Sequence, residues 1–147
     1  MQRFLQKYIA MKKIISFACL FMLTSSVLAQ KPFCGKFSND EYKIFLQINF
    51  TDKNIIVPDQ EIFGELDGYI GSTQCTTVWP ITSSTLKGKN ASIEVINNYG
   101  SEDFEASLKM LNDSTILYEH KNGSTLKFPV NRKWHKIPTK LTFTRIK

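Results

Sequence analysis

The sequence predicts an all-β protein, a single antiparallel meander of about eight to ten strands that closes into a barrel, with a β-sandwich as the alternative. Hydrophobic and polar residues alternate with a period of two in most segments after residue 33. Short turns rich in Gly, Asn and Asp separate these segments. No segment has a convincing helical period, and a meander of this length protects its strand edges best by closing on itself.

The segment 11–29 has the three-part pattern of a cleaved signal peptide. Two lysines precede an apolar run of about ten residues, and a small residue, Ala29, precedes the predicted cut before Gln30. A membrane-spanning helix needs about 20 apolar residues, so we expect no stable membrane anchor. The sequence thus predicts a signal peptide over residues 1–29, a single β-barrel domain over residues 30–147, and a periplasmic or extracellular location.

The leader pattern is complete from Met11, so we interpret Met11 as the true start of the protein. The alternative is a longer positively charged region that includes Arg3 and Lys7. Neither Cys19 nor Cys34 follows the small residues that precede a bacterial lipid-attachment cysteine, so we expect no lipid anchor.

The charge of the chain argues against a nucleic-acid partner. The formal net charge is +6, from 19 basic and 13 acidic residues. Four of the basic residues lie in the predicted leader, which leaves 15 basic and 13 acidic side chains in the remaining 118 residues. This near balance lacks the strong positive charge of a general nucleic-acid-binding protein.

Two cysteines, Cys34 and Cys75, follow the predicted leader. Exported proteins often join such pairs, and closing a loop of about 40 residues stabilises a fold by about 4 kcal/mol. We therefore predict a disulfide between them, with two free thiols as the alternative.

The first predicted strand is half-buried and has its hydrophobic residues on one parity: Tyr42, Ile44, Leu46, Ile48 and Phe50. Residues 51–54 are expected to turn the chain. A second strand over residues 55–57 should end at Pro58, which cannot donate to a strand ladder.

The segment 59–70 also alternates, and three of its hydrophobic residues should point inward: Ile62, Leu66 and Ile70. The opposite parity carries four carboxylates, interpreted as a solvated outer face in preference to a cation site: Asp59, Glu61, Glu65 and Asp67. Gly64 and Gly68 are interpreted as points of strand curvature.

The remaining strands are predicted from β-branched and aromatic residues or from alternation over residues 73–79, 91–95, 104–110, 115–118, 126–130 and 141–145. Turns are expected between them. Asn122-Gly123 is the strongest hairpin signal, because both residues tolerate a positive φ.

Two short motifs stand near the ends of the chain that follows the leader. Gly35-Lys36-Phe37 is similar to the Gly-x-Trp of the first strand of lipocalins and fatty-acid-binding proteins, with Phe in place of Trp. Arg145 is similar to the basic residue that these families carry on the last strand, packed over that aromatic ring. The resemblance implies a lipocalin-like barrel. It extends less to lipid binding, because the helix pair of fatty-acid-binding barrels is missing and Lys147 stands where their ligand-contacting Tyr would be.

The chain lacks the motifs of common enzyme classes, so we expect a non-enzymatic protein without cofactor or metal. There is no Gly-x-Ser-x-Gly, no His-Glu-x-x-His and no Gly-rich phosphate loop. The two histidines, His120 and His135, are far apart in sequence, and His120 is expected to be exposed beside a turn. The cysteines lack the spacing of zinc ligands.

A barrel of this kind predicts the binding of a small apolar ligand in its interior. The candidate lining residues are Phe37, Ile44, Leu46, Leu66, Phe104, Phe128, Phe143 and Arg145. These side chains would serve equally as a filled core, because eight-stranded barrels occur in both forms.

The C-terminal part of the chain is strongly basic. No acidic residue follows Glu119, and the densest positive stretch is Arg132, Lys133, Trp134, His135 and Lys136. A basic patch with an aromatic residue attracts an acidic protein, an anionic glycan or lipid head groups. The alternative function is therefore a protein-interaction or inhibitor module that binds an envelope protein, and an ordinary solvated face is the simpler interpretation of the patch.

Overall fold

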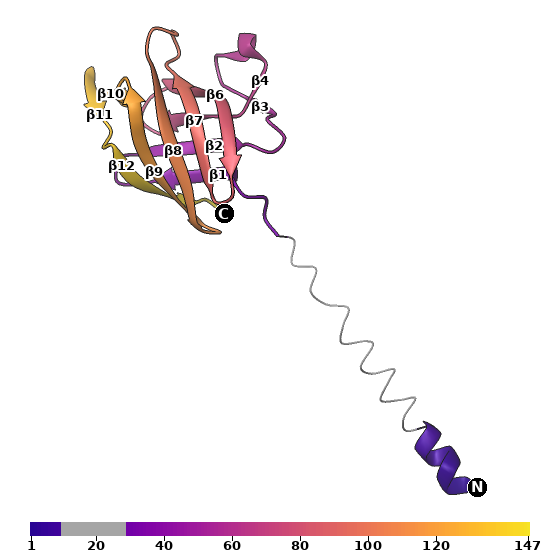
Figure 1. Ribbon diagram of the computed structural model, residues 1–147. Helices are drawn as coiled ribbons and strands as arrows, with labels where there is room; N and C mark the ends of the chain where they lie inside the picture. The colour runs from indigo at the N-terminus through magenta and orange to yellow at the C-terminus, as the bar shows by residue number, and fades with distance from the viewer. Residues whose placement is uncertain (10–28) are drawn as a thin grey trace.

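A closed antiparallel β-barrel forms the body of the protein (Figure 1). The computed structural model describes residues 1–9 and 29–147. Eight strands close the barrel in the order β1-β12-β9-β8-β7-β6-β5-β2, which is a meander interrupted by two excursions. The predicted all-β barrel is therefore confirmed, and the closed wall excludes a β-sandwich.

The barrel wall consists of strands of five to ten residues: β1 (Cys34–Asn39), β2 (Ile44–Asn49), β5 (Gly68–Ser72), β6 (Val78–Lys87), β7 (Asn90–Ile96), β8 (Asp103–Asn112), β9 (Thr115–Gly123) and β12 (Lys140–Arg145). The first excursion joins β2 to β5 and contains β3 (Ile55–Ile56), the 3-10 turn η1 (Glu61–Phe63) and β4 (Glu65–Leu66). The second joins β9 to β12 and contains β10 (Lys127–Val130) and β11 (Lys133–Lys136).

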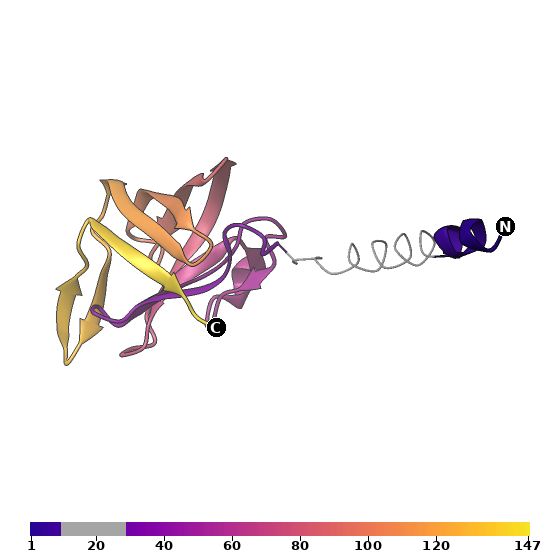
Figure 2. The same ribbon diagram turned by 90° about the horizontal axis from the view of Figure 1, so that it is seen from below.

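Antiparallel pairing gives the barrel two different ends. At the terminal end, β1 begins with Cys34, β12 finishes with Arg145, and the β6–β7 and β8–β9 turns lie beside them. At the hairpin end lie the β1–β2, β5–β6 and β7–β8 connections and the point where β9 continues into β10. Figure 2 shows the β10–β11 ribbon projecting beyond the barrel wall.

The inward parity of the strands forms the hydrophobic core. The alternation predicted for three strands is confirmed by buried side chains at Ile44, Leu46 and Ile48, at Ala91, Ile93 and Val95, and at Phe104, Ala106, Leu108 and Met110. Each fully buried large aliphatic or aromatic side chain stabilises the fold by about 1.5–3 kcal/mol relative to its exposed state. The core is continuous from Phe33 at the terminal end to the second excursion, which adds Leu126, Phe128 and Ile137.

The strand predicted over residues 59–70 is wrong in its first part. Residues 61–63 form η1, and the Ile62 side chain, expected to point inward, is 91% exposed. Asp59 has a positive φ of 59°, which turns the chain out of an extended conformation before alternation can be realised. Residues 73–77 were also expected in a strand, and they form the loop that precedes β6.

Asp67 does not belong to a solvated outer face. Its side chain is only 7% exposed, with the Lys53 ammonium 3.2 Å from one carboxylate oxygen, and the Ser84 hydroxyl donates to the same oxygen. A carboxylate is buried only when such partners replace its water, so Asp67 joins the first excursion to the wall strand β6.

Gly64 and Gly68 have different roles from one another. Gly64 follows η1 with a φ of +67° in open space. Gly68 has a φ of +157° and is paired with Ile48, whose Cα would lie 2.9 Å from a Cβ at position 68. Only Gly68 therefore marks a close approach of two strands.

The strongest predicted hairpin turn is in the wrong place. Asn122 and Gly123 belong to β9 and pair with β8. The chain turns instead between β10 and β11, at Asn131-Arg132, where φ values of 51° and 63° match a two-residue type I′ connection. Arg132 has no special tolerance for positive φ, so the signal was absent from the sequence.

The predicted disulfide between Cys34 and Cys75 is wrong, because both cysteines are free. Cys34 begins β1 at the terminal end, whereas Cys75 lies in the β5–β6 connection at the hairpin end. A strand rises about 3.3 Å per residue, so the length of β1 separates them by far more than the roughly 7 Å that a disulfide allows between Cα atoms.

Outside the barrel, residues 2–9 form a short exposed helix. The signal-peptide prediction falls mainly on residues 10–28, which lie outside the described residues, so it stays a prediction. Within residues 1–9 and 29–147, no helix is long and apolar enough to cross a membrane.

Candidate functional site

Arg145 closes the terminal end in the manner that the resemblance implied. Its guanidinium carbon lies 4.4 Å from the centre of the Phe37 ring. Its Nη1 donates to the Cys34 carbonyl at 2.6 Å, and its Nε donates to the Asp113 carbonyl at 3.0 Å. One side chain thus joins β1, β12 and the β8–β9 turn.

Gly35 makes this arrangement possible. Its φ is +132°, and a Cβ at this position would lie 2.6 Å from Arg145 Nη1. The glycine of the Gly-x-aromatic motif therefore provides both the backbone conformation and the space that the guanidinium occupies.

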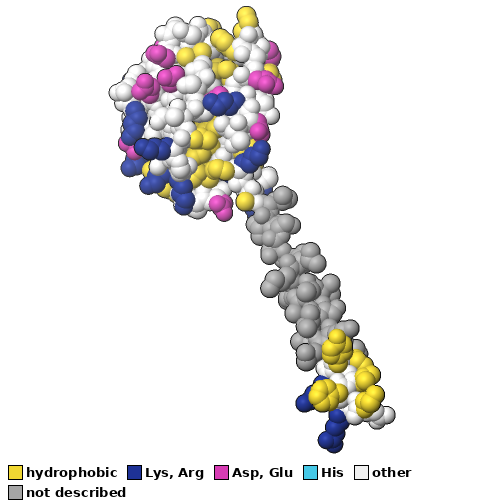
Figure 3. All heavy atoms as spheres, turned by 45° about the vertical axis from the view of Figure 1, so that its right-hand side comes forward, with side chains coloured by type: hydrophobic (Ala, Val, Ile, Leu, Met, Phe, Trp, Pro, Cys, Tyr) yellow, Lys and Arg dark blue, Asp and Glu magenta, His cyan; other side chains and the backbone are white. Residues whose placement is uncertain are grey.

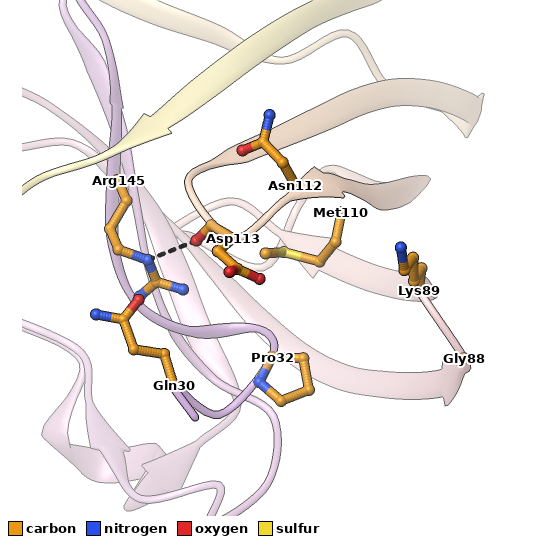
Figure 4. Close-up of a pocket in the computed structure, with 8 residues that line it drawn as sticks. All are labelled: Gln30, Pro32, Gly88, Lys89, Met110, Asn112, Asp113 and Arg145. Carbon is orange, nitrogen blue, oxygen red and sulfur yellow. Dashed lines mark hydrogen bonds between the residues drawn. The ribbon is translucent and has the colours of Figure 1, made fainter. Parts of the chain in front are cut away.

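We call Gly35, Phe37 and Arg145 together the clamp. A hollow of about 310 Å³ lies beside it (Figure 4), lined by Gln30, Pro32, Gly88, Lys89, Met110, Asn112, Asp113 and Arg145. Figure 4 shows the Arg145 side chain at its edge, with the Nε bond to the Asp113 carbonyl. Because Arg145 donates to two backbone carbonyls and covers Phe37, we assign it a structural role.

The other predicted lining residues form the packed interior or lie outside it. Phe37, Leu46 and Phe143 have no surface that a water molecule could reach. Ile44, Phe104 and Phe128 are at most 3% exposed, and Leu66 lies half-buried on β4, outside the barrel wall. In this conformation the side chains pack against one another where a ligand would lie.

Tyr118 is the exception within this apolar interior. Its side chain is fully buried on β9, with its ring edge-to-face against Phe143 at 6.2 Å. Its hydroxyl is the buried side-chain polar atom of the described residues that lacks a hydrogen-bond partner. Burial raises the pKa of the Tyr118 phenol well above its ordinary value, because ionisation would place a charge in the core.

The two histidines lie on different elements, with different surroundings. His120 is half-buried and not exposed as expected: its ring stacks on Phe104 at 5.4 Å, and its Nε2 lies 2.9 Å from the Ser124 carbonyl. His135 lies exposed on β11. Among the residues that the structure describes, no three His, Cys, Asp or Glu side chains gather where they could hold a metal ion.

The predicted basic patch lies on one exposed ribbon. We call β10, β11 and their turn the basic hairpin, and its exposed members are Arg132, Lys133, Trp134, His135 and Lys136. The opposite strand anchors it: Phe128 is buried in the core, and the Trp79 indole donates to the Lys127 carbonyl at 3.0 Å.

A smaller hollow of about 170 Å³ lies where the basic hairpin meets the barrel rim. We call it the aromatic hollow, and it is lined by Thr77, Trp79, Asn97, Asn98, Tyr99, Ser101, Glu102, Lys127 and Trp134. The Lys127 ammonium lies 2.8 Å from Glu102 and 5.4 Å from the centre of the Trp134 ring. Of this set, the sequence patterns identified only Trp134. Tyr99 lies between the strands predicted over residues 91–95 and 104–110, and an aromatic residue in the expected turn was the available signal for it.

Another group of exposed hydrophobic residues lies on the first excursion. Ile56, Ile62 and Phe63 are each about half exposed or more. In Figure 3, which turns this side of the barrel forward, hydrophobic side chains reach the surface between charged ones. Exposed carboxylates at Asp59, Glu61 and Glu65 surround these residues, and we assign the group no ligand.

Comparisons with known proteins returned no match: no family model, no curated protein and no solved structure matches the chain significantly.

Replacing Gly35 by Ala should lower the free energy of unfolding by about 1–3 kcal/mol, because the new Cβ meets the guanidinium in a strained backbone conformation. Gly88→Ala is the control, since Gly88 also has a positive φ but open space around it. Urea denaturation measures both. In an Arg145→Ala background, Gly35→Ala should lower the free energy of unfolding by less, because the guanidinium is gone. Equal decreases for Gly35→Ala and Gly88→Ala would show that Arg145 does not constrain residue 35.

Tyr118→Phe should raise the free energy of unfolding by about 1 kcal/mol at neutral pH, because it removes an unpaired buried hydroxyl and keeps the ring. An unfolded tyrosine ionises near pH 10. Since the folded pKa is raised, the unfolded state loses its proton first, and stability should fall as the pH rises above about 10. This alkaline fall should be smaller in Tyr118→Phe, whereas a less stable variant at neutral pH would show that the hydroxyl has a partner in solution.

Proposed function

We propose that this protein is a non-enzymatic binding module of the cell envelope or the extracellular space that captures an acidic partner protein through the basic hairpin. The observation that carries the proposal is the exposure of Arg132, Lys133, Trp134 and Lys136 on one anchored two-stranded ribbon. The proposal takes export from the leader pattern of residues 1–29.

The basic hairpin is held in place before any partner arrives. The tight turn at Asn131-Arg132 joins its strands, and Ile137 donates its N–H to the Leu126 carbonyl at 2.9 Å just beyond them. Buried Phe128 and the Trp79 bond to Lys127 tie β10 to the barrel. A rigid surface loses little conformational freedom on binding, which favours affinity.

The composition of the hairpin suits an acidic protein surface. No acidic side chain follows Glu119, so the positive potential of this region is not cancelled by acidic side chains of its own sequence neighbours. Such potentials speed association with partners of opposite charge. Trp134, which is 59% exposed, is of the residue type that most often dominates interface energetics.

Binding is a better proposal than catalysis because the contacts of His120 are not those of a general base. His120 is engaged by Phe104 and a backbone carbonyl. A general base needs a nucleophile or a substrate proton within hydrogen-bond reach, and neither of these contacts is one.

Reversing Arg132, Lys133 and Lys136 to Glu should weaken binding to a poly-L-glutamate peptide at least about tenfold at physiological salt, because the main cations are lost. Isothermal titration calorimetry at two salt concentrations measures the effect. The control reverses Lys87, Lys89 and Lys109, three exposed lysines of the wall and the terminal end that give the same change in net charge. If both variants lose the same affinity for poly-L-glutamate, the attraction depends only on net charge, and the proposal that the basic hairpin is the binding surface is wrong.

A second candidate function is the binding of an apolar ligand with a polar group inside the barrel, and the unpaired Tyr118 hydroxyl is the observation that favours it. The ligand would have to displace side chains of the second excursion, such as Leu126 and Ile137, because the interior is packed. A polar ligand atom would then complete the hydrogen bonding of Tyr118.

Native mass spectrometry after incubation with long-chain fatty acids and sterols tests this candidate. A bound species should appear with the unaltered protein and decrease in Tyr118→Phe, because the polar atom of the ligand loses its partner. Trp134→Ala should retain the species, since Trp134 lies outside the core. The absence of any bound species would show that the interior is a permanent core.

A further inference from the structure

The aromatic hollow draws its lining from three separate parts of the chain. Trp79 comes from β6, residues 97–102 come from the β7–β8 connection, and Lys127 and Trp134 come from the basic hairpin. Each part continues directly into a strand. The hollow is therefore a product of the tertiary fold and not of one mobile loop.

Two large aromatic side chains of the hollow remain open to solvent. Tyr99 is 82% exposed and Trp134 is 59% exposed, whereas Trp79 is buried. Large aromatic rings usually bury most of their surface, so two exposed ones beside the same hollow offer flat apolar faces to a ligand. The carbon–hydrogen faces of a sugar ring are apolar in the same way, and they stack on such aromatic faces.

The polar groups of the hollow can donate and accept hydrogen bonds. Lys127 Nζ lies 2.8 Å from Glu102 Oε1, and about a quarter to a third of each side chain is exposed. A hydroxyl group is both donor and acceptor, so neighbouring hydroxyls of one ring can donate to Glu102 and accept from Lys127. A ligand carboxylate would meet the negative charge of Glu102 as closely as the positive charge of Lys127. The ion pair therefore favours a neutral, hydroxyl-rich ligand over an acidic one.

The connection that carries Tyr99 and Glu102 has a fixed shape. The Asn97 side chain is buried, and its oxygen accepts from the Ser101 N–H at 2.9 Å and the Glu102 N–H at 3.3 Å. Its side-chain nitrogen donates to the Ser101 hydroxyl at 3.0 Å, and Gly100 turns the chain with a φ of +71°. These bonds place the Glu102 carboxylate before any ligand binds, which lowers the entropy lost on binding.

We propose that the aromatic hollow binds one neutral sugar residue of a glycan. The ring stacks on Trp134 and Tyr99, and its hydroxyls bond to Glu102 and Lys127. This site goes beyond the proposed capture of an acidic protein, because the ligand class differs. It shares Lys127 and Trp134 with the basic hairpin and adds Trp79 of β6 and the β7–β8 connection.

Fluorescence titration of the intact protein with neutral tetrasaccharides tests the site. The probes are β-1,4-linked glucose, β-1,4-linked N-acetylglucosamine and β-1,4-linked mannose, and the signal comes from the two tryptophans of the chain, Trp79 and Trp134. At least one probe should change the emission saturably. Tyr99→Ala and Glu102→Gln should each weaken that binding about tenfold, because one loses a stacking face and the other an acceptor of full charge.

Two control variants check that the sugar binds in the aromatic hollow and not elsewhere on the surface. Phe63→Ala removes a half-exposed aromatic ring from the first excursion and should leave sugar binding unchanged. Reversal of Arg132, Lys133 and Lys136 to Glu should also leave it unchanged, although the same variant weakens capture of poly-L-glutamate under the proposed function.

Three outcomes would overturn the inference. The first is that none of the neutral tetrasaccharides binds. The second is that Tyr99→Ala, with an unaltered circular dichroism spectrum, binds as well as the unaltered protein. The third is that tetragalacturonate or poly-L-glutamate binds more tightly than the neutral tetrasaccharides and loses affinity in Tyr99→Ala. That result would assign the aromatic hollow to an acidic glycan or an acidic peptide.

Discussion

The barrel depends on the seam between its first and last strands, and Arg145 holds that seam. The β1–β12 register joins only Phe37 with Arg145 and Ser38 with Thr144, whereas β1 pairs with β2 along its whole length. The guanidinium adds bonds to the Cys34 and Asp113 carbonyls and covers the Phe37 ring. Hydrogen bonds from a charged donor are stronger than neutral ones, so this side chain reinforces a short ladder. Two further bonds cross the seam, from Asn39 Nδ2 to the Thr142 carbonyl at 2.8 Å and from the Ile146 N–H to the Lys36 carbonyl at 2.9 Å. Gly35 is the condition for this contact, since any side chain there would occupy the place of the guanidinium.

Closure of the seam has consequences for the interior. Phe33 and Phe50 stack at 5.6 Å and fill the terminal end beside the clamp. At the hairpin end, the second excursion inserts Phe128 into the same core. Tyr118 belongs to this core too, and its buried hydroxyl has no hydrogen-bond partner. The second excursion, which buries Phe128 in the core, also carries exposed basic and aromatic residues on the outside of the hairpin end, and the proposed capture of a partner depends on them.

The candidate sites were only partly predictable, because the sequence shows composition but not proximity. The stretch from Arg132 to Lys136 is contiguous, so its charge was visible, and the structure keeps it on one ribbon. The aromatic hollow joins Trp79, Tyr99 and Trp134 from distant positions, and no local pattern relates them. Asp67 shows the same limit: alternation placed it on an outer face, but Lys53 and Ser84 approach it from other parts of the chain and allow it to be buried.

The sequence alone predicted the strand alternation and the all-β class, because both follow from the period of two in the side chains. It also indicated the residues of the clamp, Gly35, Phe37 and Arg145, through two short motifs. Three features were decided only by the tertiary structure. Cys34 and Cys75 lie at opposite ends of the barrel. The β10–β11 turn falls at Asn131-Arg132, and residues 61–63 lie outside the barrel wall. These features depend on strand register and on the path of the excursions. Register is set by which distant residues pack together once the barrel closes, and a linear pattern with a period of two is compatible with many such pairings.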